Sequence, residues 1–305
     1  MTEYGILGPC HLDSIRDYLG TAEITRGDAN WRLHTQEWER TRDTVGQGIR
    51  SNYADPEGLT TAEWVTYGQM YQALIQGGMM EALRFQKQDT KYDCEGALIW
   101  SYTDCVGETG WAILDYYLRR KAAYYWFRRA AAPVKVLVRE RGGYLVTRIV
   151  NDTLEPVTGT VDTGWWRLDG TDKEVSTHPL EVEADGMSEV AREPNPGGGR
   201  HDPREWLYAA VLRGADGRAL DQAVCLGVPH RRLKLAEPHL VTARLSDGSL
   251  EVSSSVFVHA VHAEDHGREL ISDNWFDLLP GVPVRMRVVS PNAAEPILFE
   301  ALKPK

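Results

Sequence analysis

The chain has 305 residues, of which 42% are hydrophobic and 26% charged, and this is the composition of a folded protein with room for two or three domains. Its formal net charge of −10 argues against nucleic acid as a partner, because binding to phosphates needs a basic surface, and fits a neutral substrate better. No apolar run approaches the length of about 18 residues that a membrane span needs, and the compartment, cytoplasmic or secreted, stays open.

Residues 1–132 alternate between helical periodicity and short apolar runs. Residues 9–20 place Leu12, Ile15, Tyr18 and Leu19 on one helical face that closes at Gly20. Residues 62–89 repeat apolar side chains at helical intervals, namely Val65, Met70, Leu74, Met79 and Leu83. Residues 95–104 then read as a strand buried on both sides, and residues 116–133 as a helix that Pro133 stops. This alternation predicts a parallel α/β unit.

The helical period disappears after Pro133. Residues 134–151 predict a hairpin that turns at Gly142–Gly143, and similar turns recur at 215–217 and at 246–248. Between them, residues 192–203 are rich in Pro and Gly and predict a loop that no strand could tolerate. Two β-sandwich domains are therefore expected, at residues 133–228 and 229–305.

Neither a metal nor a cofactor is predicted. The four cysteines, Cys10, Cys94, Cys105 and Cys225, lack C-x-x-C spacing and are read as mostly buried thiols. The segment "HAVHAEDH" offers His259, His262 and His266. A metal site there is disfavoured, because His259 and His262 would point to opposite faces of a strand.

Ten Trp and thirteen Tyr against five Phe raise the question of a carbohydrate ligand. Aromatic rings with polar edges suit the stacking of sugar rings, but Trp is also good core material, and the core interpretation is favoured on composition alone. The pair Trp165–Trp166 could mark a carbohydrate-binding platform. Adjacent strand residues face opposite ways, so only one of the two could contribute and at least one is expected in the core.

Three segments carry a resemblance to a known family: "TEYG" at residues 2–5, "GALIWSYTDCVGETGWAILDYYLRRKAAYYWFRRAAAPV" at 96–134 and "ISDNWFDLLPGVPVRMRV" at 271–288. The first two resemble the last quarter of the catalytic barrel of family 2 glycoside hydrolases, and within that family they are most similar to the β-mannosidase branch. The third resembles the family's C-terminal immunoglobulin-like domain. The resemblance implies the last two strand-helix units of a (β/α)8 barrel in residues 1–132, followed by two immunoglobulin-like β-sandwiches.

The resemblance also implies roles for particular residues. Glu3 matches the nucleophile at the end of the seventh barrel strand, where a retaining glycosidase forms a covalent glycosyl ester, although four letters alone are a weak signal. Trp100 matches the residue that stacks on the sugar at the floor of the pocket, the alternative being a barrel-core Trp. Weaker candidates on the expected rim loops, where solvated residues are the commoner case, are Asp104, Trp111, Trp31 and His34.

One required group is missing from the sequence. A retaining glycosidase needs a second carboxylic acid, which in this family is the Glu of an Asn-Glu pair at the end of the fourth strand, and this chain contains no Asn-Glu dipeptide. The chain is therefore expected to be the C-terminal fragment of a retaining exo-β-glycosidase acting on a carbohydrate substrate, β-mannosides before others. Its expected partner is the missing N-terminal half, and the chain alone is expected to be inactive. The alternatives are a non-catalytic carbohydrate-binding or interaction module, and the β-galactosidase, glucosaminidase or glucuronidase branches.

Overall fold

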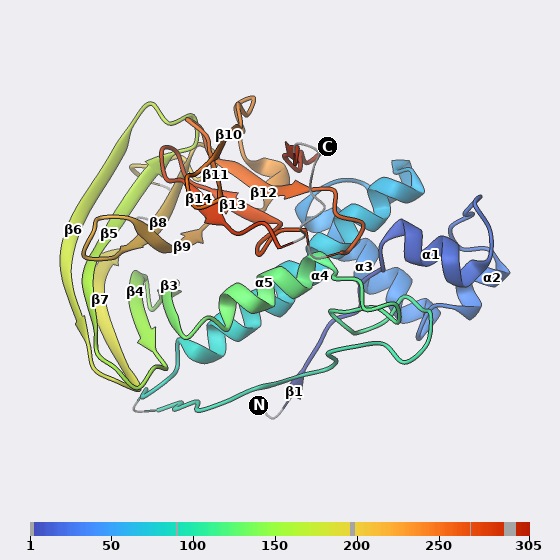
Figure 1. Ribbon diagram of the computed structural model, residues 1–305, viewed down its shortest axis with the longest axis horizontal. Coiled ribbons are helices and arrows are strands. Elements are labelled where there is room, and N and C mark those ends of the chain that lie inside the picture. The colour runs from blue at the N-terminus through green and yellow to red at the C-terminus, as the bar shows by residue number, and fades with distance from the viewer. Residues whose placement is uncertain (1–2, 90, 196–198, 269, 290–296) are drawn as a thin grey trace.

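The computed structural model describes residues 3–89, 91–195, 199–268, 270–289 and 297–305. The first part of this chain is helical and the larger remainder is built of antiparallel sheets (Figure 1). The helices are α1 (Leu12–Leu19), α2 (Ala29–Leu33), α3 (Trp38–Asn52), α4 (Thr61–Arg84) and α5 (Ala122–Ala130). No helix in these ranges has the length and apolar character needed to cross a membrane. Two short strands, β1 (Glu3–Tyr4) and β2 (Leu98–Ile99), pair in parallel, which confirms the predicted parallel α/β unit.

Local signals account for the ends of the two best-predicted helices. α1 closes at Gly20, whose left-handed backbone (φ 67°) lets its N–H donate to the carbonyl of Arg16. α4 begins with a capping box, in which the Thr60 hydroxyl accepts from the N–H of Glu63 and the Glu63 carboxylate accepts from the N–H of Thr60. The helical periodicities read from residues 9–20 and 62–89 are thus confirmed.

Seven strands follow α5 as two facing antiparallel sheets. One has the order β3 (Val134–Arg141), β4 (Tyr144–Asn151), β7 (Gly186–Pro194), and the other the order β6 (Lys173–Val182), β5 (Val157–Arg167), β8 (Trp206–Arg213), β9 (Ala219–Cys225). A buried apolar cluster that includes Val136, Ile149, Val161 and Leu212 lies between them. The hairpin at Gly142–Gly143 is confirmed, and both glycines adopt the positive φ that a two-residue turn requires.

The last part of the chain forms two smaller sheets. Their orders are β10 (Val241–Arg244), β11 (Leu250–Ser253), β14 (Val284–Met286) and β13 (Phe276–Leu278), β12 (Val258–Ala263), β15 (Phe299–Glu300). Their shared core includes Leu250, Val252, Val261, Phe276 and Leu278. The predicted turns at 215–217 and 246–248 do connect β8 to β9 and β10 to β11. The region beyond α5 is therefore β-sandwich-like throughout.

Three predictions need correction. The run 95–104 is not a strand buried on both sides, since only Leu98–Ile99 is a strand and Leu98 is 67% exposed. Residues 116–121 do not belong to the helix predicted at 116–133. The Asp115 carboxylate accepts from the N–H groups of Tyr117 and Arg119, and Leu118 is left-handed (φ 60°), so a turn forms and α5 begins only at Ala122. In the predicted loop 192–203, residues 192–194 continue β7.

The end of α4 and the helix α5 join the helical part to both pairs of sheets (Figure 1). At the C-terminal end of α4, the Lys87 ammonium lies 2.7 Å from Asp152 and 2.6 Å from Asp185 in the loops of the first sandwich. From α5, the Trp126 indole N–H donates to the carbonyl of Trp275, and Arg129 pairs with Asp273. These contacts tie the helices to the sheets through charged and polar side chains.

A buried histidine cluster lies where α3 meets the C-terminal sheets. The His259 imidazole N–H donates to the Asp277 carboxylate (2.8 Å), and the Tyr53 hydroxyl lies 3.2 Å from its other nitrogen. His230 stacks on His259 with ring centroids 3.7 Å apart. Burial is the largest influence on His230 and, with the neighbouring His259, lowers its pKa to about 3. His230 is therefore neutral at physiological pH.

Candidate functional site

The parallel pair β1–β2 has one covered face and one exposed face. Tyr4 packs on Met80 and Leu83 of α4, so Glu3, its neighbour along the strand, points away from the helices. Glu3 lies opposite Leu98 in the register, and Trp100 follows two residues after Leu98. Side-chain alternation therefore gathers Glu3, Leu98 and Trp100 on the exposed face, which we call the strand edge.

Backbone contacts hold the two strand ends close together. The Trp100 N–H donates to the Tyr4 carbonyl at 2.7 Å. A Cβ on Gly5 would lie 2.0 Å from the Trp100 carbonyl oxygen and 3.2 Å from the Trp111 ring. Only glycine permits this approach, so Gly5 fixes where the ends of β1 and β2 meet.

The two aromatic candidates Trp100 and Trp111 lie at this edge. Trp100 is 53% exposed, which leaves ring surface open to a ligand. Trp111 is partly buried beside Gly5, and the guanidinium of Arg40 lies 4.9 Å from its ring centroid. The structure thus brings Glu3, Trp100 and Trp111 into one neighbourhood.

Asp104 differs from the residues of the strand edge in being buried. Its side chain is buried, and the Lys121 ammonium lies 3.5 Å from its carboxylate and donates to the Gly8 carbonyl at 3.2 Å. Burial raises the pKa of Asp104 above its ordinary value, against the opposing influence of Lys121. Asp104 and Lys121 therefore connect the segment that follows β1 to the segment that follows β2.

The remaining two predicted residues are held by protein contacts. Trp31 is 2% exposed and meets Trp64 edge to face in the helical core, so it does not reach the strand edge in this structure. The His34 ring N–H donates to the Gly107 carbonyl at 2.7 Å, and the ring stacks on Tyr18. His34 is half-buried and fastens the chain after α2 to the loop after β2.

The sequence reasoning missed a second buried carboxyl group in that loop. Glu108 is 8% exposed, accepts a hydrogen bond from the Gln36 amide, and lies with Asp104 against Gly110. Burial raises its pKa, and the nearby Asp104 adds to the effect. No local pattern marks Glu108, because its partner Gln36 lies 72 residues away.

The sequence raises two further candidate sites, a metal site at the histidines of residues 259–266 and a carbohydrate platform at Trp165–Trp166. Among the described residues no group of three metal-ligating side chains gathers. Around these histidines β12 is irregular, with a left-handed Ala260 and a register shift. His259 donates to the Asp277 carboxylate, and His262 stacks on Trp275. Trp166 is buried in a core that both sandwiches share, as expected for one member of the pair, while Trp165 stacks on His201.

Comparison with known proteins gives one matching family model, the Mannosidase Ig/CBM-like domain, over residues 145–231. β-Mannosidase B of Thermothelomyces thermophilus is 30% identical over 64% of this chain, and β-mannosidase B of Aspergillus niger is 27% identical over 99% of it. The chain spans 26% and 37% of the length of these two relatives.

Two solved structures share the fold. The β-D-mannosidase of Dictyoglomus thermophilum superposes with a TM-score of 0.84 at 21% identity, covering 100% of this chain and 37% of its own. The exo-chitosanase of Amycolatopsis orientalis gives a TM-score of 0.66 at 16% identity, covering 93% of this chain and 39% of its own. The likeness extends across both the helical part and the sheets.

Proposed function

Since the chain matches the C-terminal portion of β-mannosidase-like family 2 glycoside hydrolases, we propose that it supplies the nucleophile half of a retaining exo-β-glycosidase that removes terminal β-mannosyl residues. Glu3 is the nucleophile of this proposal. Trp100 is the ring on which the terminal sugar stacks, and β1 and β2 are the last two strands of a catalytic barrel. In this proposal the second carboxylic acid comes from a separate N-terminal portion, and the chain itself spans only 37% of the length of the Aspergillus niger β-mannosidase B.

One observation carries the proposal: Glu3 and Trp100 share the face of the parallel pair that the helices leave open. In a barrel of parallel strands the helices cover the outside, so this face is the inner one, and reacting groups gather where the strands end. A carboxylate there can attack the anomeric carbon and later leave, which is what a double displacement requires.

The chemistry proceeds in two balanced steps. The Glu3 carboxylate bonds to the anomeric carbon as the bond to the leaving oxygen breaks, and the acid on the N-terminal portion protonates that oxygen. Water, deprotonated by the same group, then attacks the anomeric carbon as the bond from that carbon to Glu3 breaks, and the sugar leaves with its original configuration. Trp100 stays in contact with the ring throughout and excludes water from that side.

Chemical rescue tests the role of Glu3 in an enzyme assembled from this chain and a β-mannosidase N-terminal portion. Glu3→Ala should lose nearly all turnover of dinitrophenyl β-mannoside, and azide should restore it by forming the α-mannosyl azide, since azide fits the space the carboxylate left. Glu181→Ala, at an exposed position on β6, is the matched control and should keep full turnover. Loss of turnover without rescue, or a β-azide product, would remove Glu3 from this role.

The choice of sugar is tested separately with p-nitrophenyl β-mannoside, galactoside, glucosaminide and glucuronide. The mannoside should give the highest kcat/KM, because relatives matched over 64% and 99% of this chain are named as β-mannosidases. A higher value for the glucosaminide would assign the chain to the specificity that the exo-chitosanase's name indicates.

A further inference from the structure

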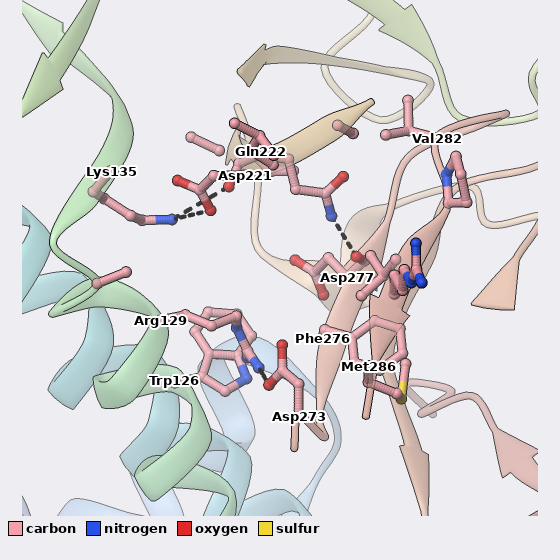
Figure 2. Close-up of a pocket in the computed structure, with 18 of the residues that line it drawn as sticks. Trp126, Arg129, Lys135, Asp221, Gln222, Asp273, Phe276, Asp277, Val282 and Met286 are labelled. Carbon is pink, nitrogen blue, oxygen red and sulfur yellow. Dashed lines mark hydrogen bonds and ion pairs between the residues drawn. The ribbon is translucent and has the colours of Figure 1, made fainter. Parts of the chain in front are cut away.

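A second candidate site lies away from the strand edge, between α5, β9 and the strands β13 and β14 (Figure 2). It is a cleft of about 790 Å³, within the range of roughly 300–1,000 Å³ that small-molecule sites occupy. We call it the inter-sandwich cleft, and the side chains that matter most in it are those of Trp126, Lys135, Asp221, Gln222, His230 and Asp277. Neither Glu3, Trp100 nor Trp111 lines it.

Two polar atoms in the cleft lack a partner among the residues that the structure describes. The Gln222 side-chain amide donates to the Asp277 carbonyl, but its own oxygen is buried without a hydrogen bond. The Nδ1 atom of His230, whose residue is 6% exposed, is also buried without one. Because buried polar atoms in folded proteins are nearly always hydrogen-bonded to protein or water, these two atoms are free to bond a water molecule or a ligand group that enters the cleft.

The charges that line the cleft balance. Among its described lining residues five are acidic and five are basic. Lys135 pairs with Asp221 at 3.0 Å and Arg129 with Asp273 at 2.5 Å (Figure 2). Asp277 pairs with His259 at 2.8 Å. A strongly charged ligand would have to separate these pairs, so the cleft favours a neutral ligand.

The polar and apolar groups that line the cleft together narrow the class of ligand further. Carboxylates accept hydrogen bonds, ammonium and guanidinium groups donate them, and the Gln222 amide and the neutral His230 can do either. Trp126 adds part-exposed aromatic surface among these groups, and the side chains of Phe276 and Met286, each 2% exposed, also line the cleft (Figure 2). Dense hydroxyl groups on an apolar ring, as in a sugar, match this pattern of alternating donors and acceptors beside aromatic carbon.

We propose that the inter-sandwich cleft binds a neutral sugar of one or two rings, at a site separate from the strand edge. The Gln222 amide oxygen accepts from one hydroxyl, and the His230 Nδ1 atom bonds another. The site does not depend on Glu3, and it would hold sugar whether or not the chain takes part in hydrolysis.

Methionine methyl resonances provide a local readout in the chain itself. Met286 lines the cleft, whereas Met187, on β7, does not. In protein labelled with 13C at the methionine methyl groups, titration with β-1,4-mannobiose should shift the Met286 signal saturably and leave the Met187 signal in place. The charged sugar glucuronate should shift neither. Met286→Leu assigns the signal.

Two cleft variants, each with a control of the same chemistry, test the contacts. Gln222→Leu should weaken mannobiose binding by about tenfold, the loss expected for a hydrogen bond made by a buried group. Gln86→Leu is its control, because Gln86 is half-buried outside the cleft. His230→Phe keeps the stacking ring but removes the nitrogen, and its control is His262→Phe, a half-buried ring stacked on Trp275.

The outcomes separate this proposal from the proposed hydrolysis. Glu3→Gln should leave the Met286 titration unchanged, because Glu3 is not part of the cleft. A Met286 signal that does not move with mannobiose up to roughly 100 mM, far above millimolar affinity, overturns the sugar site. Titrations that are the same in Gln222→Leu as in the unmodified chain overturn it too, and this variant decides the matter even where His230→Phe does not fold.

Discussion

Replacing Gly5 by alanine tests the close approach on which the strand edge depends. The added Cβ would lie 2.0 Å from the Trp100 carbonyl oxygen, about 1.3 Å inside the shortest ordinary C–H···O contact of ~3.3 Å. The obstacle is backbone, which no side-chain rotation can relieve, so β1 and β2 must separate by a comparable distance. Overpacking of this kind costs roughly 1–3 kcal/mol.

Two measurements detect the separation of β1 from β2. The Trp100 amide, which donates to Tyr4, should lose protection from hydrogen exchange by about 30-fold, the equivalent of about 2 kcal/mol. In the assembled enzyme, turnover should fall on the order of a hundredfold, since a displacement of about 1 Å at a reacting group has that effect.

Gly46→Ala is the matched control, because Gly46 lies inside α3 and an added Cβ meets nothing within 4 Å. This variant should be more stable than the unmodified chain by about 0.5–1 kcal/mol, the helix preference of alanine over glycine. Gly5→Ala protein with unchanged Trp100 exchange and unchanged stability would refute the argument that Gly5 sets the position of the strand ends.

Three further predictions concern stability, architecture and activity. The pKa of His230 falls from its ordinary value of 6.5 to about 3 on folding. The contribution of neutral His230 to the free energy of unfolding is therefore fully present above pH 6.5 and is lost as pH falls toward 3. The free energy of unfolding, measured by chemical denaturation, should fall by about 2 kcal/mol by pH 5, and His230→Phe should remove most of this pH dependence. Residues 134–305 should fold by themselves as two β-sandwiches, and a helical circular dichroism spectrum or the lack of a cooperative melt would contradict the boundary. The chain alone should not hydrolyse p-nitrophenyl β-mannoside, and clear turnover would mean that an acid such as Glu108 acts within it.

Elements marked by local signals could be predicted from the sequence. The left-handed glycine after α1 and the Gly142–Gly143 turn need only neighbouring residues, so the helix end and the hairpin followed directly. The prediction of a buried strand at 95–104 was wrong, because an apolar run does not reveal how many neighbouring strands and helices will cover it. Leu98 faces away from the helices and stays exposed.

The candidate site, too, could be predicted only where the sequence itself carries a signal. Glu3 and Trp100 were identified from a resemblance, and their common face depends on a pairing across 95 positions between Glu3 and Leu98. Trp31, expected on a rim loop, lies in the core because α2 turns its ring toward Trp64. The inter-sandwich cleft could not be foreseen at all, since its walls come from α5, β9 and β13, segments that meet only in the folded chain.

The most direct test of Glu3 as nucleophile is covalent labelling. A 2-deoxy-2-fluoro-β-mannoside with a dinitrophenyl leaving group traps the glycosyl ester. The fluorine slows both formation and hydrolysis of the ester, whereas the good leaving group speeds its formation alone, so the ester accumulates. Peptide mapping of the assembled enzyme by mass spectrometry should find one added fluoromannosyl group, on Glu3. A label on any other carboxylate, or an enzyme that turns over without being labelled, would contradict the account.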